Sequence, residues 1–341
     1  MNQRGSNPPF QFTEWRVDQD ALSDSKSDCG IFMPTYSVKM IFRRLREELR
    51  AHASKKMAKL RSIESRLEKI EARQKQIVEQ QKRLGDIPLS VYLGDGVVLT
   101  RLHSGHRIYL SANDATIAAS LITHGRWEHW IETEIRSRVK PGMKVLDVGA
   151  NHGYYTLIMG SMVGPEGHVF AFEANRDLSR LLSKSLCANG LQQSVTLCEQ
   201  AAFSHATELY LHFDAEYSGA GSVSEAGTST SVAVPAVPVD DVIPDDVELS
   251  FVKIDAEGSE YHVLQGMRKV LARSTQLTMI IEFYAPWVAP HMDPLAYLQK
   301  FTADGFTIRC LWESGPTGTL SAEQVLQQTG KDGVSYLLLE R

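Results

Sequence analysis

The chain has 341 residues, 43% of them hydrophobic and 23% charged, which excludes a collagen-like or wholly disordered protein and leads us to expect about two domains. Its four cysteines are too few and too scattered for a disulfide framework, and none forms the C-x-x-C pair of a cysteine-rich zinc site. The absence of a run of about 18 apolar residues and of a secretory start favours a soluble, cytoplasmic protein.

The formal net charge of −5 is divided unevenly along the chain. Residues 38–83 carry fifteen Lys or Arg against six Asp or Glu, whereas residues 84–341 carry eighteen against thirty. The acidic C-terminal part argues against nucleic acid as a partner, because phosphate binding requires a basic surface. The basic segment leaves a peripheral contact with an anionic membrane open, next to a merely solvated helix face.

The first two segments of the chain differ in composition and periodicity. Residues 1–37 are polar and aperiodic, which predicts a disordered tail. Residues 38–84 contain no Pro or Gly and are rich in strong helix formers, which predicts a long helix. From Leu60 the seam repeats at heptad spacing, with Leu60, Leu67, Gln74 and Gln81 at one position and Ile63, Ile70, Ile77 and Leu84 at the other. We therefore expect a coiled coil that forms a homodimer through residues 38–84, of open orientation, with a single solvated helix as the alternative.

Residues 89–341 have the texture of a globular domain. Residues 89–140 predict short strands and helices that precede the main sheet, and residues 144–341 alternate between strand and helix patterns. Such alternation predicts a doubly wound, mostly parallel α/β sheet. The last two strands, 306–312 and 334–340, show no clear helix between them and predict an antiparallel edge strand. Residues 214–230 predict either a hairpin loop or a mobile flap over the site.

The strongest local signal is the run Val145 to Tyr155, VLDVGANHGYY. It predicts a buried strand, an acidic residue and a Gly-x-x-x-Gly turn that opens a helix, at the carboxyl ends of the strands, where ligands bind. Gly149 lets the backbone approach a ligand and Gly153 opens the helix. Asp147 suits a cationic or amino-bearing ligand better than a pyrophosphate. Taken alone, the run is also compatible with an ordinary strand-ending turn.

A second carboxylate, Glu173, comes 24 positions after Gly149, at the end of the next strand. There it can accept hydrogen bonds from the 2′ and 3′ hydroxyls of a ribose. Asp147 and Glu173 together describe a nucleoside with a positively charged or amino-bearing appendage, and S-adenosylmethionine (SAM) fits that description. NAD fits less well, because the Gly-x-Gly-x-x-Gly turn is absent.

A second constellation is FVKIDAEG, residues 251–258. Strand alternation places Lys253 and Asp255 on one face, Glu257 follows where the strand ends, and Glu282 ends the neighbouring strand. The functional hypothesis is that these groups orient an acceptor hydroxyl and remove its proton. Two alternatives stay open: Lys253 merely neutralises Asp255, or the carboxylates bind a hard cation.

These runs resemble the FkbM-type SAM-dependent methyltransferases. VLDVGANHGYYT, FAFEAN, FVKIDAEGSE and IIEFY follow in the family's order, after GRWEHWIETEIRSRVKPGMK. The resemblance covers about residues 89–341 and implies a class I methyltransferase fold, a Rossmann-like sheet of seven mostly parallel strands with the last antiparallel. It implies a cofactor set of Glu128, Asp147, Gly149, Asn151, Gly153, Tyr154, Glu173, Ala174 and Asn175. His152 and Ala256 depart from the family's usual apolar residue and Val, and His152 could reshape the acceptor side.

The activity implied by this resemblance is O-methylation of a sugar, a glycan or another small-molecule hydroxyl such as that of a secondary metabolite. We assign the catalytic roles to Asp255, Glu257, Glu282 and Lys253 and expect no metal. His152 and His262 remain weaker candidates for the base. One alternative is a non-catalytic coiled-coil scaffold that binds SAM or a nucleotide. Another, less favoured, is an NAD-dependent oxidoreductase.

Overall fold

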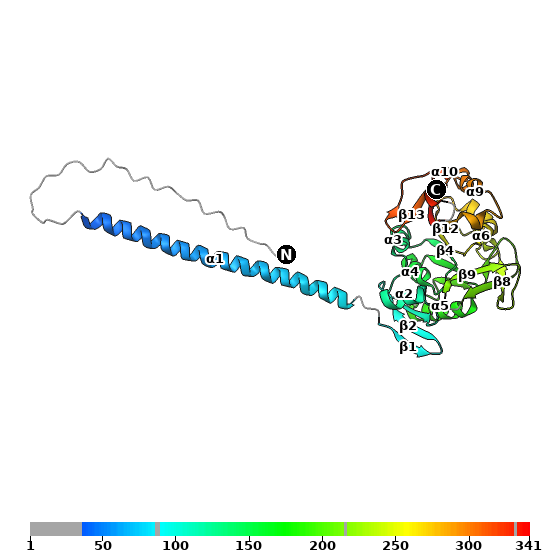
Figure 1. Ribbon diagram of the computed structural model, residues 1–341, viewed down its shortest axis with the longest axis horizontal. Helices are drawn as coiled ribbons and strands as arrows, with labels where there is room; N and C mark the ends of the chain where they lie inside the picture. The colour runs from blue at the N-terminus through cyan, green and yellow to red at the C-terminus, as the bar shows by residue number, and fades with distance from the viewer. Residues whose placement is uncertain (1–35, 86–88, 215–216, 331–332) are drawn as a thin grey trace, which may run out of the picture. The chain divides into compact units, whose positions relative to one another are not determined.

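The computed structural model describes residues 36–85, 89–214, 217–330 and 333–341 (Figure 1). The chain divides into two units, Met1–Ile77 and Val78–Arg341. The tail predicted for residues 1–37 lies outside the described residues, apart from Tyr36 and Ser37, which begin the first helix.

Helix α1, Tyr36–Gly85, runs for 50 residues and supplies all the described residues of the first unit. At 1.5 Å per residue it is about 75 Å long. Its many Leu, Arg, Lys, Glu and Gln residues favour helix, and Gly85 is its last residue. The apolar side chains of Leu60, Ile63, Leu67 and Ile70 are 46–54% exposed.

The second unit is organised around an eight-stranded sheet of order β14-β13-β15-β12-β11-β4-β5-β6. In chain order the strands are β4 (Lys144–Val148), β5 (His168–Phe172), β6 (Val195–Cys198), β11 (Phe251–Ile254), β12 (Thr278–Tyr284), β13 (Thr307–Trp312), β14 (Gly315–Pro316) and β15 (Val334–Glu340). Strands β4, β5, β6, β11 and β12 pair in parallel, and β15 runs antiparallel between β12 and β13. The strand order reverses at β4, so the carboxyl ends of β4 and β11 form the switch point where such sheets bind ligands.

Helices cover both faces of this sheet, and each face has its own apolar core. Consecutive residues of β4 point to opposite sides, so Val145 packs into one core and Leu146 into the other. One face is covered by α2 (Ile117–His124), α3 (His129–Arg138), α4 (Tyr154–Val163) and α5 (Arg176–Asn189). The other is covered by α6 (Glu260–Gly266), α7 (Arg268–Arg273), α8 (Ala285–Val288), α9 (Pro294–Ala303) and α10 (Ala322–Thr329). The doubly wound arrangement is confirmed.

Three details of the predicted sheet are wrong. The sheet has eight strands instead of seven, because the chain folds back after Trp312 and adds the two-residue strand β14, too short to leave a periodic pattern. The antiparallel strand β15 lies inside the sheet and not at its edge. A helix, α10, does occur between the last two long strands, and it begins with a capping box formed by Ser321 and Gln324.

Two smaller sheets flank the main one. The first is an antiparallel sheet of β1 (Val91–Gly94), β2 (Val97–Arg101) and β3 (Arg107–Ser111). The second has the order β7-β10-β8-β9 and contains β7 (Ala201–Ala202), β8 (Thr207–Asp214), β9 (Tyr217–Ser224) and β10 (Val232–Val237), with the 3-10 turn η1 (Val239–Asp241) after it. The segment 214–230 is thus mainly a strand, since β9 pairs antiparallel with β8.

Over the described helices, none combines the length and the apolar character that a membrane crossing requires.

Candidate active site

The turn after β4 is shaped by three residues with positive φ: Gly149 at 75°, Asn151 at 52° and Gly153 at 89°. A Cβ on Gly149 would lie 1.8 Å from the backbone oxygen of Asp255, and one on Gly153 would lie 2.1 Å from Cδ1 of Leu182. Only glycine lets the β4 turn pass this close to the end of β11. The Gly-x-x-x-Gly spacing read from the sequence therefore has a steric cause.

Gly149→Ala is expected to destabilise the fold by more than the roughly 1 kcal/mol that a left-handed φ alone costs an alanine, and to weaken ligand binding at the turn at least tenfold. The matched control is Gly190→Ala, because Gly190 has a similar φ of 71° but nothing within 4 Å of an added Cβ. Urea unfolding and calorimetric titration with S-adenosylhomocysteine measure both effects. Equal losses in the two variants would contradict the steric explanation.

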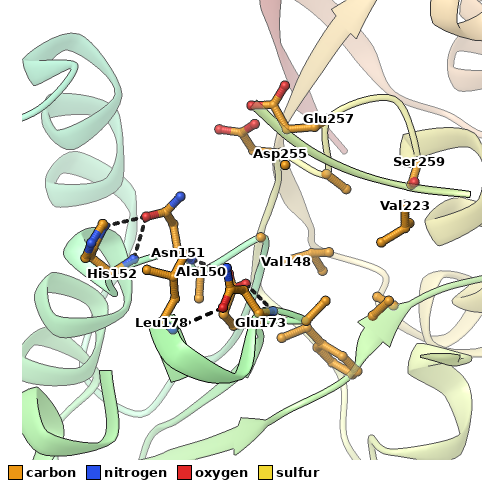
Figure 2. A pocket seen from close by; sticks show the side chains of 18 of the residues that line it. Val148, Ala150, Asn151, His152, Glu173, Leu178, Val223, Asp255, Glu257 and Ser259 are labelled. Carbon is orange, nitrogen blue, oxygen red and sulfur yellow. Dashed lines mark hydrogen bonds between the residues drawn. The ribbon is translucent and has the colours of Figure 1, made fainter. Parts of the chain in front are cut away.

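Glu173 joins the turn after β4 to the turn after β5. Its Oε2 accepts a hydrogen bond from the backbone N–H of Asn151 at 2.6 Å, and its Oε1 accepts one from that of Asn175 at 2.8 Å (Figure 2). Burial raises the pKa of this carboxyl to about 7, although the two backbone donors oppose the rise. Asn175 in turn caps α5, since its side chain accepts from the backbone N–H of Asp177.

His152 packs against the same turn. It is 1% exposed, and its Nε2 accepts from the backbone N–H of Ser111 at 3.2 Å while its Nδ1 lies 2.6 Å from the side-chain oxygen of Asn151. Burial lowers the pKa of His152 to about 4, so the ring is neutral at physiological pH. His152 lines the cavity described below, and both of its ring nitrogens are already engaged, by Ser111 and Asn151.

A cavity opens at the switch point, between the ends of β4, β5 and β11 and the β8–β9 hairpin. Of the residues predicted for the cofactor, the cavity is lined by Gly149, Asn151, Tyr154, Glu173, Ala174 and Asn175. Apolar side chains such as Val148, Leu178 and Val223 complete the wall (Figure 2). Leu211, Gly221 and Val223 of the hairpin also line the cavity; none was named as a site residue, although one alternative for residues 214–230 was a flap over the site.

Asp147 does not reach this cavity. Its side chain is fully buried, and its Oδ2 accepts from the hydroxyl of Thr156 on α4 at 2.5 Å. Burial raises the pKa of the Asp147 carboxyl, an effect opposed by the charge of Lys253. The prediction that Asp147 contacts an amino-bearing part of the ligand is thus not supported by its position.

Glu128 also lies away from the cavity lining, within a hydrogen-bonded network beside it. Its Oε2 accepts from the hydroxyl of Tyr155 at 2.9 Å, and its Oε1 lies 3.2 Å from the hydroxyl of Tyr336. The same Tyr336 hydroxyl is 3.1 Å from Oδ2 of Asp255, so its one proton can be donated to either carboxylate. Burial and the charge of Asp255 raise the pKa of Glu128. Tyr336 was missed in the sequence, where nothing marks a β15 side chain as a neighbour of β11.

Lys253 and Asp255 form an ion pair at the edge of the cavity. Lys253 is 2% exposed, its Nζ donates to Oδ2 of Asp255 at 3.0 Å, and it lies 4.9 Å from the ring centre of Tyr155. A lysine this deeply buried requires a carboxylate partner. The charge of Asp255 accordingly counters the effect of burial on Lys253 and raises its pKa.

Asp255, Glu257 and Glu282 bring their carboxylates together, with one oxygen from each within 4.8 Å of the others. Burial, followed by the charge of Asp255, raises the pKa of Glu257 to about 8 and that of Glu282 to about 10. These raised pKa values favour the protonated form of both groups at neutral pH, because burial and the charge of a neighbouring carboxylate both oppose ionisation. Oε2 of Glu282 is buried and has no hydrogen-bond partner among the described residues. The cluster can exchange a proton, and its oxygens are also of the type that hard cations prefer.

Glu260, not predicted as a site residue, holds the loop that carries Glu257. Its Oε1 accepts from the backbone N–H of Ala256 at 2.8 Å and its Oε2 from that of Gly258 at 3.0 Å. This bracing helps to keep Glu257 at a φ of 48°, which non-glycine residues rarely adopt. His262, the weaker candidate for the base, stacks on Phe203 at a centroid distance of 4.2 Å and is absent from the cavity lining.

Part of the chain that contains this site matches a known protein family. Residues 147–308 match the family model described as the methyltransferase FkbM domain. The chain contains an FkbM methyltransferase domain. The match begins at Asp147 near the end of β4 and ends within β13, and so includes the carboxylates of both constellations.

Other relatives match the chain over shorter stretches or with lower similarity. It is 40% identical over 48 residues to the protein-L-isoaspartate O-methyltransferase of Methanothrix thermoacetophila, covering 14% of this chain and 23% of that protein. It is 36% identical over 61 residues to the enzyme of the same name from Ignicoccus hospitalis, covering 18% and 29%. The chain thus spans about a quarter of the length of the curated relatives it matches.

Solved structures resemble the FkbM domain more distantly. The methyltransferase FkbM from Methylobacillus flagellatus is 16% identical with a TM-score of 0.38, covering 61% of this chain and 50% of that one. A SAM-dependent methyltransferase from Aquifex aeolicus is 15% identical with a TM-score of 0.35, covering 62% and 88%. The class I assignment rests instead on the strand order, with β15 antiparallel between β12 and β13.

The methyl donor of the FkbM domain is SAM, and the Glu173 carboxylate fits it. Each Glu173 oxygen accepts one backbone N–H and keeps a second acceptor site. Because burial disfavours the charged carboxylate, two further donors from a ribose diol would stabilise it. Glu173, Ala174, Asn175 and Asn151 are therefore the residues that would hold the nucleoside.

Proposed function

We propose that this protein transfers a methyl group from SAM to a hydroxyl oxygen of a sugar, a glycan or a secondary metabolite. The observation that carries the proposal is the carboxylate cluster of Asp255, Glu257 and Glu282 beside the cofactor cavity. An alcohol is a weak nucleophile near neutral pH, so a positioned base accelerates its reaction. A site for hydroxyl methylation needs such a base next to the methyl donor.

In this proposal Asp255 takes the proton of the acceptor hydroxyl. When bound, SAM supplies an electrophilic methyl group, and the displacement depends mainly on alignment. Lys253 keeps Asp255 oriented through the 3.0 Å contact, and Tyr336 restrains the same oxygen from β15. Glu257 lines the cavity, and its raised pKa favours the protonated form, which can donate a hydrogen bond to an acceptor oxygen; Glu282 lies beside it, outside the cavity lining.

We assign the cluster to proton transfer and not to a metal ion. Oδ2 of Asp255 already contacts the ammonium of Lys253 and the hydroxyl of Tyr336. The lysine therefore already supplies the positive charge that a metal ion would bring to this carboxylate. Transfer is therefore expected to persist after treatment with EDTA, and its loss with recovery on adding Mg²⁺ would contradict this assignment.

The proposed activity is tested by incubating the protein with methyl-labelled SAM and separate glycan, small-molecule and protein fractions. Label is expected in the glycan or small-molecule fraction and to survive mild alkali, because an ether is stable where a methyl ester releases methanol. Alkali-labile label in the protein fraction would overturn the hydroxyl assignment in favour of carboxyl methylation. SAM binding without transfer to any fraction would favour the scaffold alternative.

We place this activity in the cytoplasm. Among the described residues, Cys187, Cys198 and Cys310 are unpaired thiols, which suits a reducing compartment. A peripheral membrane contact through the basic helix is the alternative that the vesicle experiment below addresses.

A further inference from the structure

Helix α1 carries an apolar stripe that nothing in the catalytic mechanism uses. Leu60, Ile63, Leu67 and Ile70 are spaced three and four residues apart and so lie on one side of the helix. Each is 46–54% exposed. Single helices are held mainly by packing of such a face, so the stripe indicates an interaction surface.

The charges that border this stripe are sorted by sign. With Leu60 and Leu67 at heptad position a, and Ile63 and Ile70 at position d, the g positions are basic and the e positions are acidic between residues 59 and 73. The g residues are Lys59, Arg66 and Arg73, and the e residues are Glu64 and Glu71. All five are exposed on the helix.

This sorting selects a partner and an orientation. In a parallel, in-register pair of identical helices, each g residue faces the e residue of the next heptad on the other copy. Lys59 would then face the partner's Glu64, and Arg66 would face the partner's Glu71. In an antiparallel pair, g faces g and e faces e, so Lys and Arg would oppose basic groups and Glu would oppose Glu. We propose that residues 57–84 assemble with further copies of this chain into a parallel, in-register coiled coil.

The same charges disfavour a membrane as the occupant of the stripe. A helix that lies on an anionic surface needs basic residues along both borders of its apolar face. Here Glu64 and Glu71 line one border, where an anionic headgroup would repel them. A second copy instead supplies Lys59 and Arg66 to that border.

The two heptads that contain Leu60, Ile63, Leu67 and Ile70 have Leu at position a and Ile at position d. This combination shifts parallel coiled coils from two helices toward three or four. Either a dimer or a larger parallel bundle is consistent with the g-to-e pairing, which repeats around every such interface.

The test is the mass of the full chain in solution, measured by light scattering after gel filtration. The wild type is expected at two or more times the 38.0 kDa of one chain. Glu64→Lys combined with Glu71→Lys makes both charged g-to-e contacts repulsive in a parallel coil and is expected to weaken association at least tenfold. Adding Lys59→Glu and Arg66→Glu restores opposite charges and is expected to restore the mass.

The controls separate orientation, net charge and folding. Glu48→Lys combined with Glu68→Lys changes the net charge equally but keeps every g-to-e pair, so it is expected to keep the wild-type mass. In an antiparallel coil Glu64→Lys with Glu71→Lys would only exchange Glu–Glu for Lys–Lys contacts, so an unchanged mass would overturn the parallel assignment. Circular dichroism and stabilisation by S-adenosylhomocysteine check that each variant keeps its helix and its catalytic unit.

Two further outcomes would overturn the proposal. One is a wild-type mass of 38.0 kDa at all concentrations tested. The other is a monomer that sediments with phosphatidylserine-containing vesicles through α1, which would assign the stripe to a membrane. Both readouts are independent of methyl transfer, so this proposal and the proposed function can fail separately.

Discussion

Glu173→Gln is expected to weaken binding of S-adenosylhomocysteine at least 100-fold. A Gln side chain keeps one oxygen but turns an NH₂ group toward the backbone N–H of either Asn151 or Asn175, both of which now donate to Glu173. It also removes the charged acceptor for the ribose hydroxyls, and hydrogen bonds to charged groups contribute about 1.5–3 kcal/mol each. Ligand at about 100 times its dissociation constant stabilises a protein by about 2.7 kcal/mol, so the variant should lose a thermal shift of several degrees.

The pH dependence of binding gives this prediction a second readout. Because burial raises the pKa of Glu173 to about 7, the ligand-free site still holds the proton at pH 6 and has released it by pH 8. A ribose diol stabilises the ionised form, so the dissociation constant is expected to fall as the pH rises through 7. Glu260, with a raised pKa of about 7, titrates in the same range. The contribution of Glu173 is therefore measured by how much more steeply the dissociation constant changes with pH in the wild type than in Glu173→Gln.

Glu166→Gln is the matched control, since Glu166 is exposed and precedes β5 at the opposite end of that strand. It is expected to bind S-adenosylhomocysteine as the wild type does, with the same pH dependence. Calorimetric titration at pH 6, 7 and 8 measures all three proteins. Equal affinity of Glu173→Gln and the wild type would remove Glu173 from the cofactor site.

Asp255→Asn is expected to reduce methyl transfer at least 100-fold, in the range of about 10² to 10⁴ that a general base contributes. It is also expected to lower stability by about 3 kcal/mol, because Lys253 would remain buried without an ionised partner. Binding of S-adenosylhomocysteine is expected to persist, since Glu173 and the β4 turn are unchanged. This combination separates a base from a residue that holds the cofactor.

Two control variants accompany Asp255→Asn. Asp246→Asn makes the same chemical change on an exposed loop and is expected to alter neither stability nor transfer. Tyr336→Phe removes a hydroxyl that contacts Asp255 but leaves the Lys253 pair in place. Transfer by Asp255→Asn at the wild-type rate, measured with labelled SAM at a temperature where the variant is folded, would reject Asp255 as the base.

The positions of the cofactor residues were largely readable from the sequence, because their signals are local. A buried apolar run, a Gly-x-x-x-Gly turn and a Glu after the next run mark the ends of adjacent parallel strands. The structure accordingly brings Gly149, Asn151 and Glu173 to one cavity. Asp147 shows the limit of that reasoning, since a strand places consecutive side chains on opposite faces and this one points into the core beside Thr156.

Contacts between elements far apart in the chain could not be predicted from local sequence patterns. Tyr336 meets Glu128 across 208 positions of sequence and Asp255 across 81. The sequence left residues 214–230 as a hairpin loop or a flap over the site, and it did not predict that β9 pairs with β8 and lines the cavity. The helix α10 shows a different limit, since its capping box at Ser321 and Gln324 was present in the sequence but its eight residues are too few for a clear apolar period.

The sequence by itself determined the alternation of the main parallel strands with helices, the cofactor turn and the heptad spacing of α1, because each depends on residues close together in the chain. The tertiary structure alone decided which carboxylates meet, that the pKa values of Glu257 and Glu282 are raised, and that Lys253 is buried against Asp255. The physical reason is that a pKa and an ion pair depend on burial and on neighbours from other strands, which no stretch of sequence specifies.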